Sequence, residues 1–298
     1  MRILLMVLVT SFVFTGCQQK QTKVTSQEAV IGESITAEKL MKQKPVILDV
    51  RPSFEFNLAH VPGAINVRWE DFSRPEAKNR GLLQNDLFAL ARRLSLIGID
   101  PETKVVVLGK GREGNGEEGR VAWTLKVLGV QQVYTLLHTS YRQLNPREIP
   151  APVKNKPYWK PQVDEDLTVH LAEFRAYATG KVDKTNFSPR YGYKPIEAVE
   201  NLVILDVRSS QEFAQRNLSQ FKDVKAKVVS MEWRELFDAA NLPSKKAVEL
   251  LAAKGVLKNN IIFVISNHGV RSGAATYALQ YLGFGRVSNF SGGYEQWK

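Results

Sequence analysis

The chain has 298 residues, of which 44% are hydrophobic and 24% charged. These fractions exclude wholesale disorder, and the length allows two ordinary domains and a tail. The formal net charge of +11 suits anionic partners, but the sequence has no run of four consecutive basic residues, so a solvated basic surface is favoured over nucleic-acid binding.

The first residues have the layout of a secretory signal. Arg2 precedes an apolar run over residues 3–14, which is too short to cross a bilayer as a permanent helix. The following Thr15-Gly16-Cys17 resembles the lipobox of bacterial lipoproteins, although Phe14 replaces the usual Leu. An uncleaved apolar anchor, or a plain signal peptide with an incidental Cys, is the alternative.

The lipobox resemblance implies a signal peptide over residues 1–16, lipidation of Cys17 and a flexible polar tether up to residue 31. Gln18 after the Cys resembles lipoproteins sorted to the outer membrane, which implies a lipid-anchored protein of the cell envelope, on the periplasmic face of that membrane. Cys17 is the only cysteine, so the chain can form no internal disulfide, and its lipidation would leave the mature protein without a free thiol.

One pattern of strands and helices then occurs twice. Apolar runs at 46–51 and 202–208 both end in Asp-Val-Arg, and each is typical of a buried strand in a parallel sheet. An amphipathic helix is predicted over 86–97. Each copy continues with a strand, a polar loop, a helix closed by Gly and a last strand. In the first copy the strand, helix and last strand are expected over 104–108, 120–128 and 132–136. In the second copy they are expected over 261–265, 272–282 and 286–290.

Strands alternating with helices predict the α/β class, here two doubly wound domains, each a mainly parallel sheet flanked by helices with ligand loops at the strand carboxyl ends. Three prolines between residues 146 and 152 predict a linker over 146–163. The first domain is therefore expected over 32–145 and the second over 164–298, with a long inserted loop at 181–193.

Several separated motifs resemble the rhodanese family. Asp49-Val50-Arg51 and the segment from His60 to Asn66 are similar to the opening signatures of a rhodanese domain. In the second copy, Gly269-Val270-Arg271-Ser272 and residues 291–297 resemble the active loop and the closing segment. The resemblance covers residues 33–298, and the layout is similar to that of thiosulfate and 3-mercaptopyruvate sulfurtransferases, in which only the C-terminal domain is catalytic.

The resemblance implies chemistry that needs a cysteine. In the family, loop N–H groups and a helix N-terminus surround a Cys, lower its thiol pKa and hold an anionic sulfur donor, and the thiolate becomes a persulfide. Counting back from Gly-x-Arg-Ser places Ser266 at this position in the second domain, and Gly109 takes it in the first. Both domains are therefore expected to be inactive in sulfur transfer.

An anion-binding loop is nevertheless predicted, with Asp206 and Arg208 in support. Its residues are Ser266, Asn267, His268, Gly269, Val270, Arg271 and Ser272. Arg271 either holds an anion or pairs with Asp206 or Glu212, and these two readings remain open. Glu212 stands where two-domain sulfurtransferases tend to carry a substrate-binding Arg, and residues 217–227 replace the segment that begins with His60 in the first copy.

Other chemistries are disfavoured. Ser266 lacks the Gly-x-Ser-x-Gly elbow of a hydrolase nucleophile, and His268 is too near in sequence to act as its base. The Gly-rich degenerate loop of the first domain, from Gly109 to Arg120, lacks a Gly-Lys-Ser/Thr ending and is predicted to be a mobile surface loop. His60 is expected to be structural, and no metal site and no cofactor are expected.

The sequence thus predicts a rhodanese-family envelope lipoprotein that is catalytically inactive and binds a small oxyanion, a sulfur-containing anion or a protein partner. It would contact the membrane through its lipid and would not bind nucleic acid. Two alternatives are an active thiosulfate or 3-mercaptopyruvate sulfurtransferase and a purely structural envelope lipoprotein.

Overall fold

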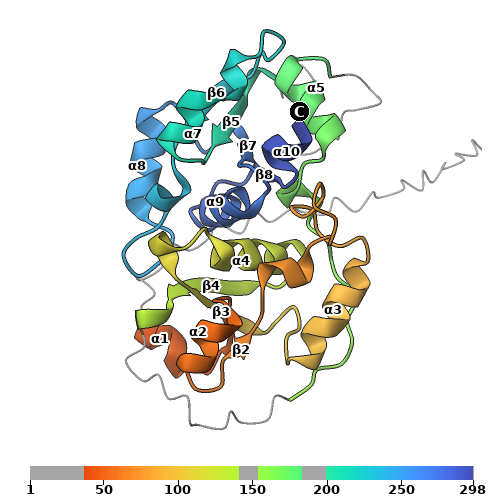
Figure 1. Cartoon of the computed structure of the whole chain (residues 1–298), viewed down its shortest axis with the longest axis vertical. Coiled ribbons are helices and arrows are strands. Elements are labelled where there is room, and N and C mark those ends of the chain that lie inside the picture. The colour runs from red at the N-terminus through yellow and green to blue at the C-terminus, as the bar shows by residue number, and fades with distance from the viewer. Residues whose placement is uncertain (1–36, 141–153, 183–198, 298) are drawn as a thin grey trace, which may run out of the picture. The chain divides into compact units, whose positions relative to one another are not determined.

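The computed structural model describes residues 37–140, 154–182 and 199–297 (Figure 1). The predicted signal peptide, Cys17 and tether lie outside these ranges. So do residues 141–145 of the predicted first domain, residues 146–153 of the predicted linker and most of the predicted inserted loop. The described residues belong to one compact unit, Gly32–Lys298. No helix within the described ranges combines the length and the apolar character that a membrane span needs.

The first domain is a four-stranded parallel sheet with the strand order β2-β1-β3-β4. Its strands are β1 Val46–Asp49, β2 Ile65–Asn66, β3 Lys104–Gly109 and β4 Gln132–Leu137. Its α-helices are α1 Ala37–Lys42, α2 Ser53–Leu58, α3 Leu87–Leu96 and α4 Glu117–Val127, and its 3-10 helices are η1 Trp69–Phe72, η2 Gly111–Glu113 and η3 His138–Ser140.

The second domain repeats this topology with the strand order β6-β5-β7-β8, again all parallel. Its strands are β5 Leu202–Asp206, β6 Lys227–Ser230, β7 Ile261–Ile265 and β8 Val287–Phe290. Its described helices are α5 Leu171–Thr179, α7 Ser210–Gln215, α8 Lys245–Ala253, α9 Val270–Tyr281 and α10 Gly293–Trp297, with η4 Glu165–Leu167, η6 Leu218–Gln220 and η7 Trp233–Leu236. The predicted fold class, two α/β domains with parallel sheets flanked by helices, is confirmed.

The apolar runs become central strands because both faces of each sheet are covered. Every residue of β5 and β7 is buried, which explains why these strands are uninterrupted by polar residues. The predicted helix over 86–97 is α3, and the side chain of Asp86 caps it by accepting a hydrogen bond from the N–H of Ala89 at 2.8 Å.

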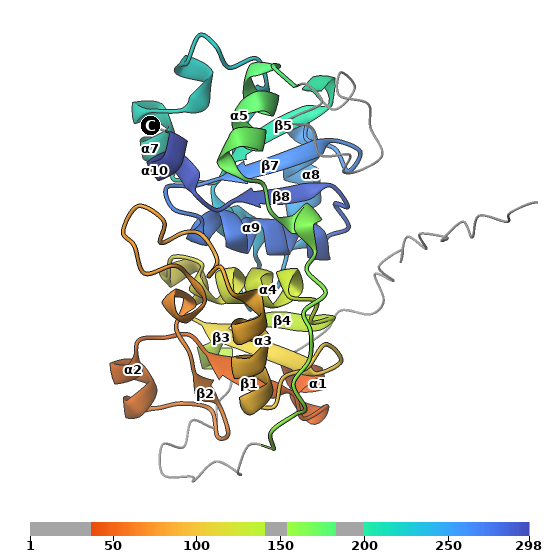
Figure 2. The same ribbon diagram turned by 90° about the vertical axis from the view of Figure 1, so that its right-hand side faces the viewer.

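Helices α4 and α9 lie side by side between the two sheets (Figure 1, Figure 2). Small residues permit this approach, since a Cβ on Gly119 would lie 2.5 Å from the Cβ of Ala274. Helix α9 is buried along most of its length because it packs on its own sheet and on α4. One hydrophobic core therefore runs through both domains, with Trp123 and Trp233 among its fully buried members.

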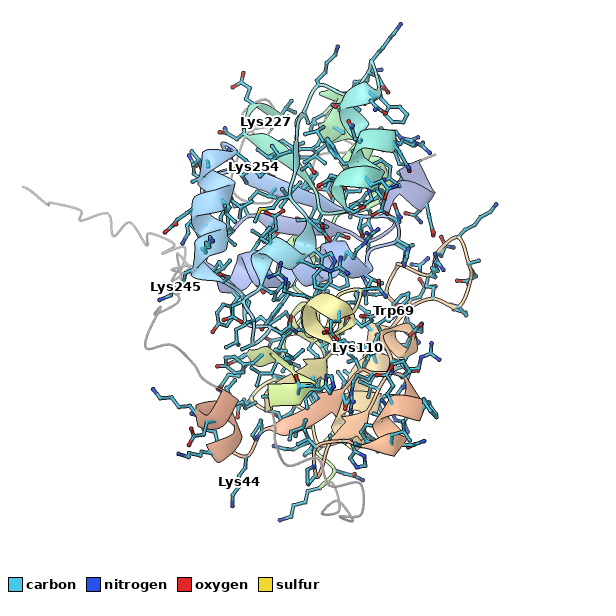
Figure 3. The ribbon with its side chains drawn as sticks, turned by 60° about the vertical axis from the view of Figure 1, so that its left-hand side comes forward. Lys44, Trp69, Lys110, Lys227, Lys245 and Lys254 are labelled. Carbon is cyan, nitrogen blue, oxygen red and sulfur yellow. The ribbon has the colours of Figure 1, made fainter. Side chains whose placement is uncertain are left out.

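The positive charge is spread over separate elements. Lys44, Lys227 and Lys245 are exposed and come from different parts of the two domains (Figure 3). This arrangement agrees with the absence of long basic runs in the sequence.

Candidate active-loop site

The candidate site lies at the carboxyl edge of the second sheet. Asp206 ends β5, and its register partner on the neighbouring strand is Ile265, the last residue of β7. Ser266 follows directly, so the parallel pairing brings Asp206 and the loop 266–272 to the same edge, as the sequence predicts.

Ser266 occupies the centre of the loop and is 1% exposed. Its Oγ accepts hydrogen bonds from the backbone N–H of Gly269 at 3.2 Å and of Ser272 at 3.3 Å, and it lies 3.0 Å from Oγ of Ser272. Ser272 is in the first turn of α9, so the positive end of the helix dipole also faces Ser266. The donors predicted around the Cys position are therefore present, and they serve the Ser hydroxyl.

Glycine is required at position 269. Its φ is +81°, in the left-handed region, and a Cβ there would lie 2.3 Å from the carbonyl oxygen of Ser291. The closing segment holds the other end of the loop, because the N–H groups of Tyr294 and Glu295 donate to the carbonyls of Ser266 and Asn267 at 2.9 and 3.1 Å. The active-loop and closing motifs thus form one hydrogen-bonded unit.

Arg271 pairs with Glu212, one of the two acids that the sequence analysis named as its possible partners. Its Nη1 and Nη2 donate to the two carboxylate oxygens at 2.7 and 2.8 Å, and Asn267 Nδ2 donates to Oε1 of the same carboxylate at 2.9 Å. The hydrogen bond from Arg271 holds the pKa of Glu212 well below its usual range, against the opposing effect of burial. Arg271 therefore braces the loop against α7.

Asp206 and Arg208 form a buried ion pair behind the loop. Arg208 Nη2 lies 2.7 Å from Asp206 Oδ2 and also donates to the carbonyl of Arg216. Tyr294 donates its hydroxyl to Asp206 at 2.9 Å, and its ring lies 3.8 Å from the Arg208 guanidinium carbon. Burial and the neighbouring Asp206 raise the pKa of Tyr294, so the hydroxyl keeps its proton. Both residues thus have the supporting position that the sequence predicts.

Asn217 replaces His60 in the second domain. His60 Nδ1 lies 2.9 Å from the carbonyl of Phe56, and Asn217 Nδ2 donates to the carbonyl of Phe213 at the same distance. In each case the side chain contacts the carbonyl of the residue four positions earlier, which lies in the preceding short helix. His60 therefore has a structural contact, and the second domain keeps that contact with a different side chain.

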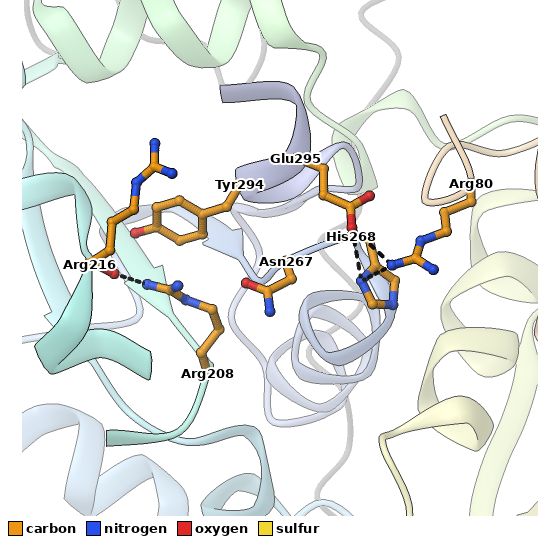
Figure 4. Close-up of a pocket in the computed structure, with 7 residues that line it drawn as sticks. All are labelled: Arg80, Arg208, Arg216, Asn267, His268, Tyr294 and Glu295. Atoms are coloured by element: carbon orange, nitrogen blue, oxygen red, sulfur yellow. Dashed lines mark hydrogen bonds and ion pairs between the residues drawn. The ribbon is translucent and has the colours of Figure 1, made fainter. Parts of the chain in front are cut away.

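A cavity of about 360 Å³ opens beside the loop (Figure 4). It is lined by Arg80, Arg208, Arg216, Asn267, His268, Tyr294 and Glu295. Ser266 is buried and is not part of this lining.

The cavity has an arginine-rich wall with one acid. Arg80 of the first domain donates to Glu295 at 2.9 Å and lies 3.3 Å from Nδ1 of His268. Burial, followed by the charge of Arg80, lowers the pKa of His268. Arg216 makes no ion pair within the described ranges, and its guanidinium carbon lies 5.5 Å from the Phe221 ring centre. With its pKa lowered, His268 is neutral at pH 7 and faces Arg80 and Glu295. The hydrogen-bond partners of Ser266 Oγ are instead Gly269 and Ser272.

Sequence reasoning missed four of these lining residues as members of the site. Tyr294 and Glu295 belong to the closing motif, so their position was signalled, but Arg80 and Arg216 carry no local pattern. Among the residues that the structure describes, no three His, Cys, Asp or Glu side chains gather as a metal site would require.

The prediction of a mobile surface loop over 109–120 is wrong. Most of this segment is buried, including Gly109, Glu118 and Arg120, and α4 begins at Glu117 within it. The reason is contact with the second domain, where Arg120 Nη1 donates to the carbonyl of Gly269 at 3.1 Å. Burial lowers the pKa of Arg120 to about 9, and the guanidinium stacks on Trp123 at 4.4 Å. The first domain thus helps to hold the active loop of the second.

The chain is similar to known proteins in sequence and in fold. A family model described as Rhodanese-like domain matches residues 35–143 and 188–298. A thiosulfate sulfurtransferase of Pseudomonas aeruginosa is 24% identical over 286 residues, which covers 90% of this chain and 93% of the relative.

Two solved structures illustrate the similarity in fold. The 3-mercaptopyruvate sulfotransferase SseA from Escherichia coli has a TM-score of 0.64 and 18% identity, over 87% of this chain and 95% of that chain. Wild-type EanB has a TM-score of 0.62 and 18% identity, over 85% of this chain and 61% of that chain. At these identities the similarity demonstrates the fold alone.

Proposed function

Because the chain belongs to the rhodanese-like domain family, we propose that it is a rhodanese-fold lipoprotein of the cell envelope that binds a small anion and does not transfer sulfur. The observation that carries this proposal is Ser266, which by its place in the loop motif corresponds to the family's cysteine and accepts hydrogen bonds from the N–H groups of Gly269 and Ser272. A Ser hydroxyl stays protonated there and cannot form the S–S bond of a persulfide. Gly109, in the first domain, has no side chain to react.

The rest of the chain supplies no substitute thiol. Cys17 is the only cysteine, and its lipobox-like context supports lipidation, which would consume its thiol. A sulfane sulfur would then have no cysteine acceptor on the mature protein. The pseudoenzyme assignment therefore follows from the chemistry that both loops lack.

The ligand class follows from the cavity wall. Arg80, Arg216 and the amide of Asn267 offer positive charge and a hydrogen-bond donor at the mouth of the loop, which suits an oxyanion such as sulfate or thiosulfate. Thermal unfolding with each anion tests this binding, since a ligand at 100 times its Kd stabilises a protein by about 2.7 kcal/mol. A melting temperature that neither anion raises, at matched ionic strength, would contradict anion binding.

The variant E212Q is expected to bind these anions about tenfold more tightly than the wild type. Loss of the carboxylate charge frees the Arg271 guanidinium from its bidentate pair and leaves a neutral amide that still reaches Ser209. Calorimetric titration with sulfate measures the change. E232Q is the matched control, because the pair Arg234–Glu232 has similar exposure and lies outside the cavity lining. Equal affinities for wild type and E212Q would mean that Arg271 does not reach the ligand.

An active sulfurtransferase is the competing function, favoured by the 24% identical thiosulfate sulfurtransferase. Thiosulfate:cyanide sulfurtransferase activity of the wild-type protein separates the two. Turnover above the level of S266A would overturn the proposed function. If the protein shows neither sulfurtransferase activity nor anion binding, that result would favour a protein partner or a purely structural role.

The variant C17S is expected to lose the membrane anchor. Without the Cys that resembles the lipidated residue of lipoproteins, the protein should incorporate no palmitate when produced in a bacterial host and should leave the membrane fraction. Q18D is the paired variant. The protein should keep its lipid but no longer be sorted to the outer membrane, because residue 18 corresponds to the sorting position of lipoproteins. Palmitate labelling that persists in C17S would contradict lipidation at Cys17.

A further inference from the structure

The carboxyl group of Glu118 fills the space beside Gly109, the position that corresponds to the family's cysteine in the first domain. Glu118 is 1% exposed. A Cβ built on Gly109 would lie 2.2 Å from Glu118 Oε2, so any larger side chain at 109 requires the carboxyl group to move. The loop of the first domain is therefore occupied by the chain itself.

The partner of this carboxyl group comes from the second domain. Asn241, between η7 and α8, is 1% exposed and donates its Nδ2 to Glu118 Oε1 at 2.8 Å. The same short segment is anchored to the first domain by Thr135 Oγ1, which donates to the carbonyl of Asn241 at 2.7 Å, and by the N–H of Leu137, which donates to the carbonyl of Ala240 at 3.0 Å. Glu118 thus makes one of several polar contacts that join the two domains.

The donors and acceptors at this contact do not balance if the carboxyl group is ionised. Glu118 Oε2 and Asn241 Oδ1 are both buried acceptors without a hydrogen-bond partner among the described residues. Leaving such groups unsatisfied is unfavourable, and burying an unpaired anion is more so. A proton on the carboxyl group would neutralise it and supply the donor that the pair lacks.

The surrounding charges do not compensate a carboxylate here. Glu117 repels it from the same helix, and Glu118 forms no ion pair within the described ranges. The nearby charged or titratable groups have other partners: Lys110 pairs with Glu55, Arg234 donates to the carbonyls of Arg112 and Gly114, His138 faces the carbonyl of Gly109, and Asp238 accepts from the N–H groups of Ala240 and Leu242. Burial, with a further contribution from Glu117, raises the pKa of Glu118 to about 7, although hydrogen bonding from Asn241 and nearby backbone N–H groups opposes the shift.

We propose that Glu118 is held as a neutral carboxylic acid paired with the Asn241 amide, so that it closes the loop of the first domain and makes this contact between the domains depend on a proton. The two domains then differ in kind. Glu212 of the second domain is an ionised partner of Arg271, whereas Glu118 meets only an amide. External anions are excluded from the first loop whether or not the second domain binds one.

Urea unfolding of the full chain at a series of pH values tests whether Glu118 is protonated in the folded protein. A native pKa of about 7 for Glu118, against 4.5 when unfolded, means that the native state binds the proton more tightly. The stabilisation by this proton is complete below pH 4.5, is lost as the pH rises to 7, and changes little above that. We expect the folding constant of wild type, relative to E118Q, to fall by a factor on the order of 100 across this window.

E117Q is the control from the same helical turn. It keeps the Glu118 carboxyl group and should keep the pH dependence, with the pKa of Glu118 somewhat lower because the repulsion from Glu117 is removed. Parallel wild-type and E118Q curves across the window would overturn the proposal. Should E118Q fail to fold, carbon-13 NMR of labelled glutamate in the wild type decides instead. One glutamate carboxyl with a midpoint near 7 supports a protonated Glu118, whereas a set of midpoints with none above the usual value of about 4.3 overturns it.

Discussion

Replacing Ser266 by Cys is expected to give the protein the ability to move sulfur from thiosulfate to cyanide, which the proposed function denies to the wild type. The new thiol would take the place of an Oγ that already accepts hydrogen bonds from the N–H groups of Gly269 and Ser272. These donors and the N-terminus of α9 favour the thiolate, and comparable sites lower a thiol pKa from about 8.5 by one unit or more. The measurement is the rate of thiocyanate formation by S266C as a function of pH.

Two variants control this experiment. S266A keeps the loop without a nucleophile and should be as silent as the wild type. G109C places a thiol at the corresponding position of the first domain, where the Glu118 carboxyl group blocks the site, and should be silent and less stable. Turnover by S266C alone would mean that the second loop retains the geometry that sulfur transfer requires. Equal turnover by S266C and G109C would contradict the blocking of the first loop by the Glu118 carboxyl group.

Replacing Asp206 by Ala is expected to destabilise the protein by about 3–5 kcal/mol, the usual cost of breaking a buried ion pair. Asp206 is fully buried, and the Arg208 side chain is 5% exposed, so the guanidinium would lose its carboxylate where water cannot replace it. The hydroxyl of Tyr294 would lose its acceptor as well. Urea unfolding at neutral pH measures the difference.

The control for D206A is E70A, which breaks the exposed pair between Arg68 and Glu70. Surface pairs of this kind contribute little because water solvates both partners, so E70A should unfold close to the wild-type midpoint. Similar midpoints for D206A and E70A would show that the buried pair does not hold the loop support together.

Local sequence pattern was enough to predict the fold and the absence of a cysteine from both loops. The runs ending at Asp49 and Asp206 are uninterrupted because both faces of their strands are buried, and that property is written in consecutive residues. The position of Ser266 follows from counting within one loop, and the proposal that the mature protein has no free thiol rests on composition and a lipobox resemblance. These features need no knowledge of which distant elements meet.

Pairing across the fold was decided only by the tertiary structure. Arg271 finds Glu212 59 residues away, and Arg80 meets His268 across 188 residues, so neither partner can be read from spacing. The loop from Gly109 to Arg120 looks exposed as a Gly-rich polar sequence but is largely buried, because α4 packs against α9 and Asn241 covers Glu118. Burial and charge pairing depend on which surfaces the folded chain brings together, and one-dimensional pattern contains that information only for neighbours on the same element.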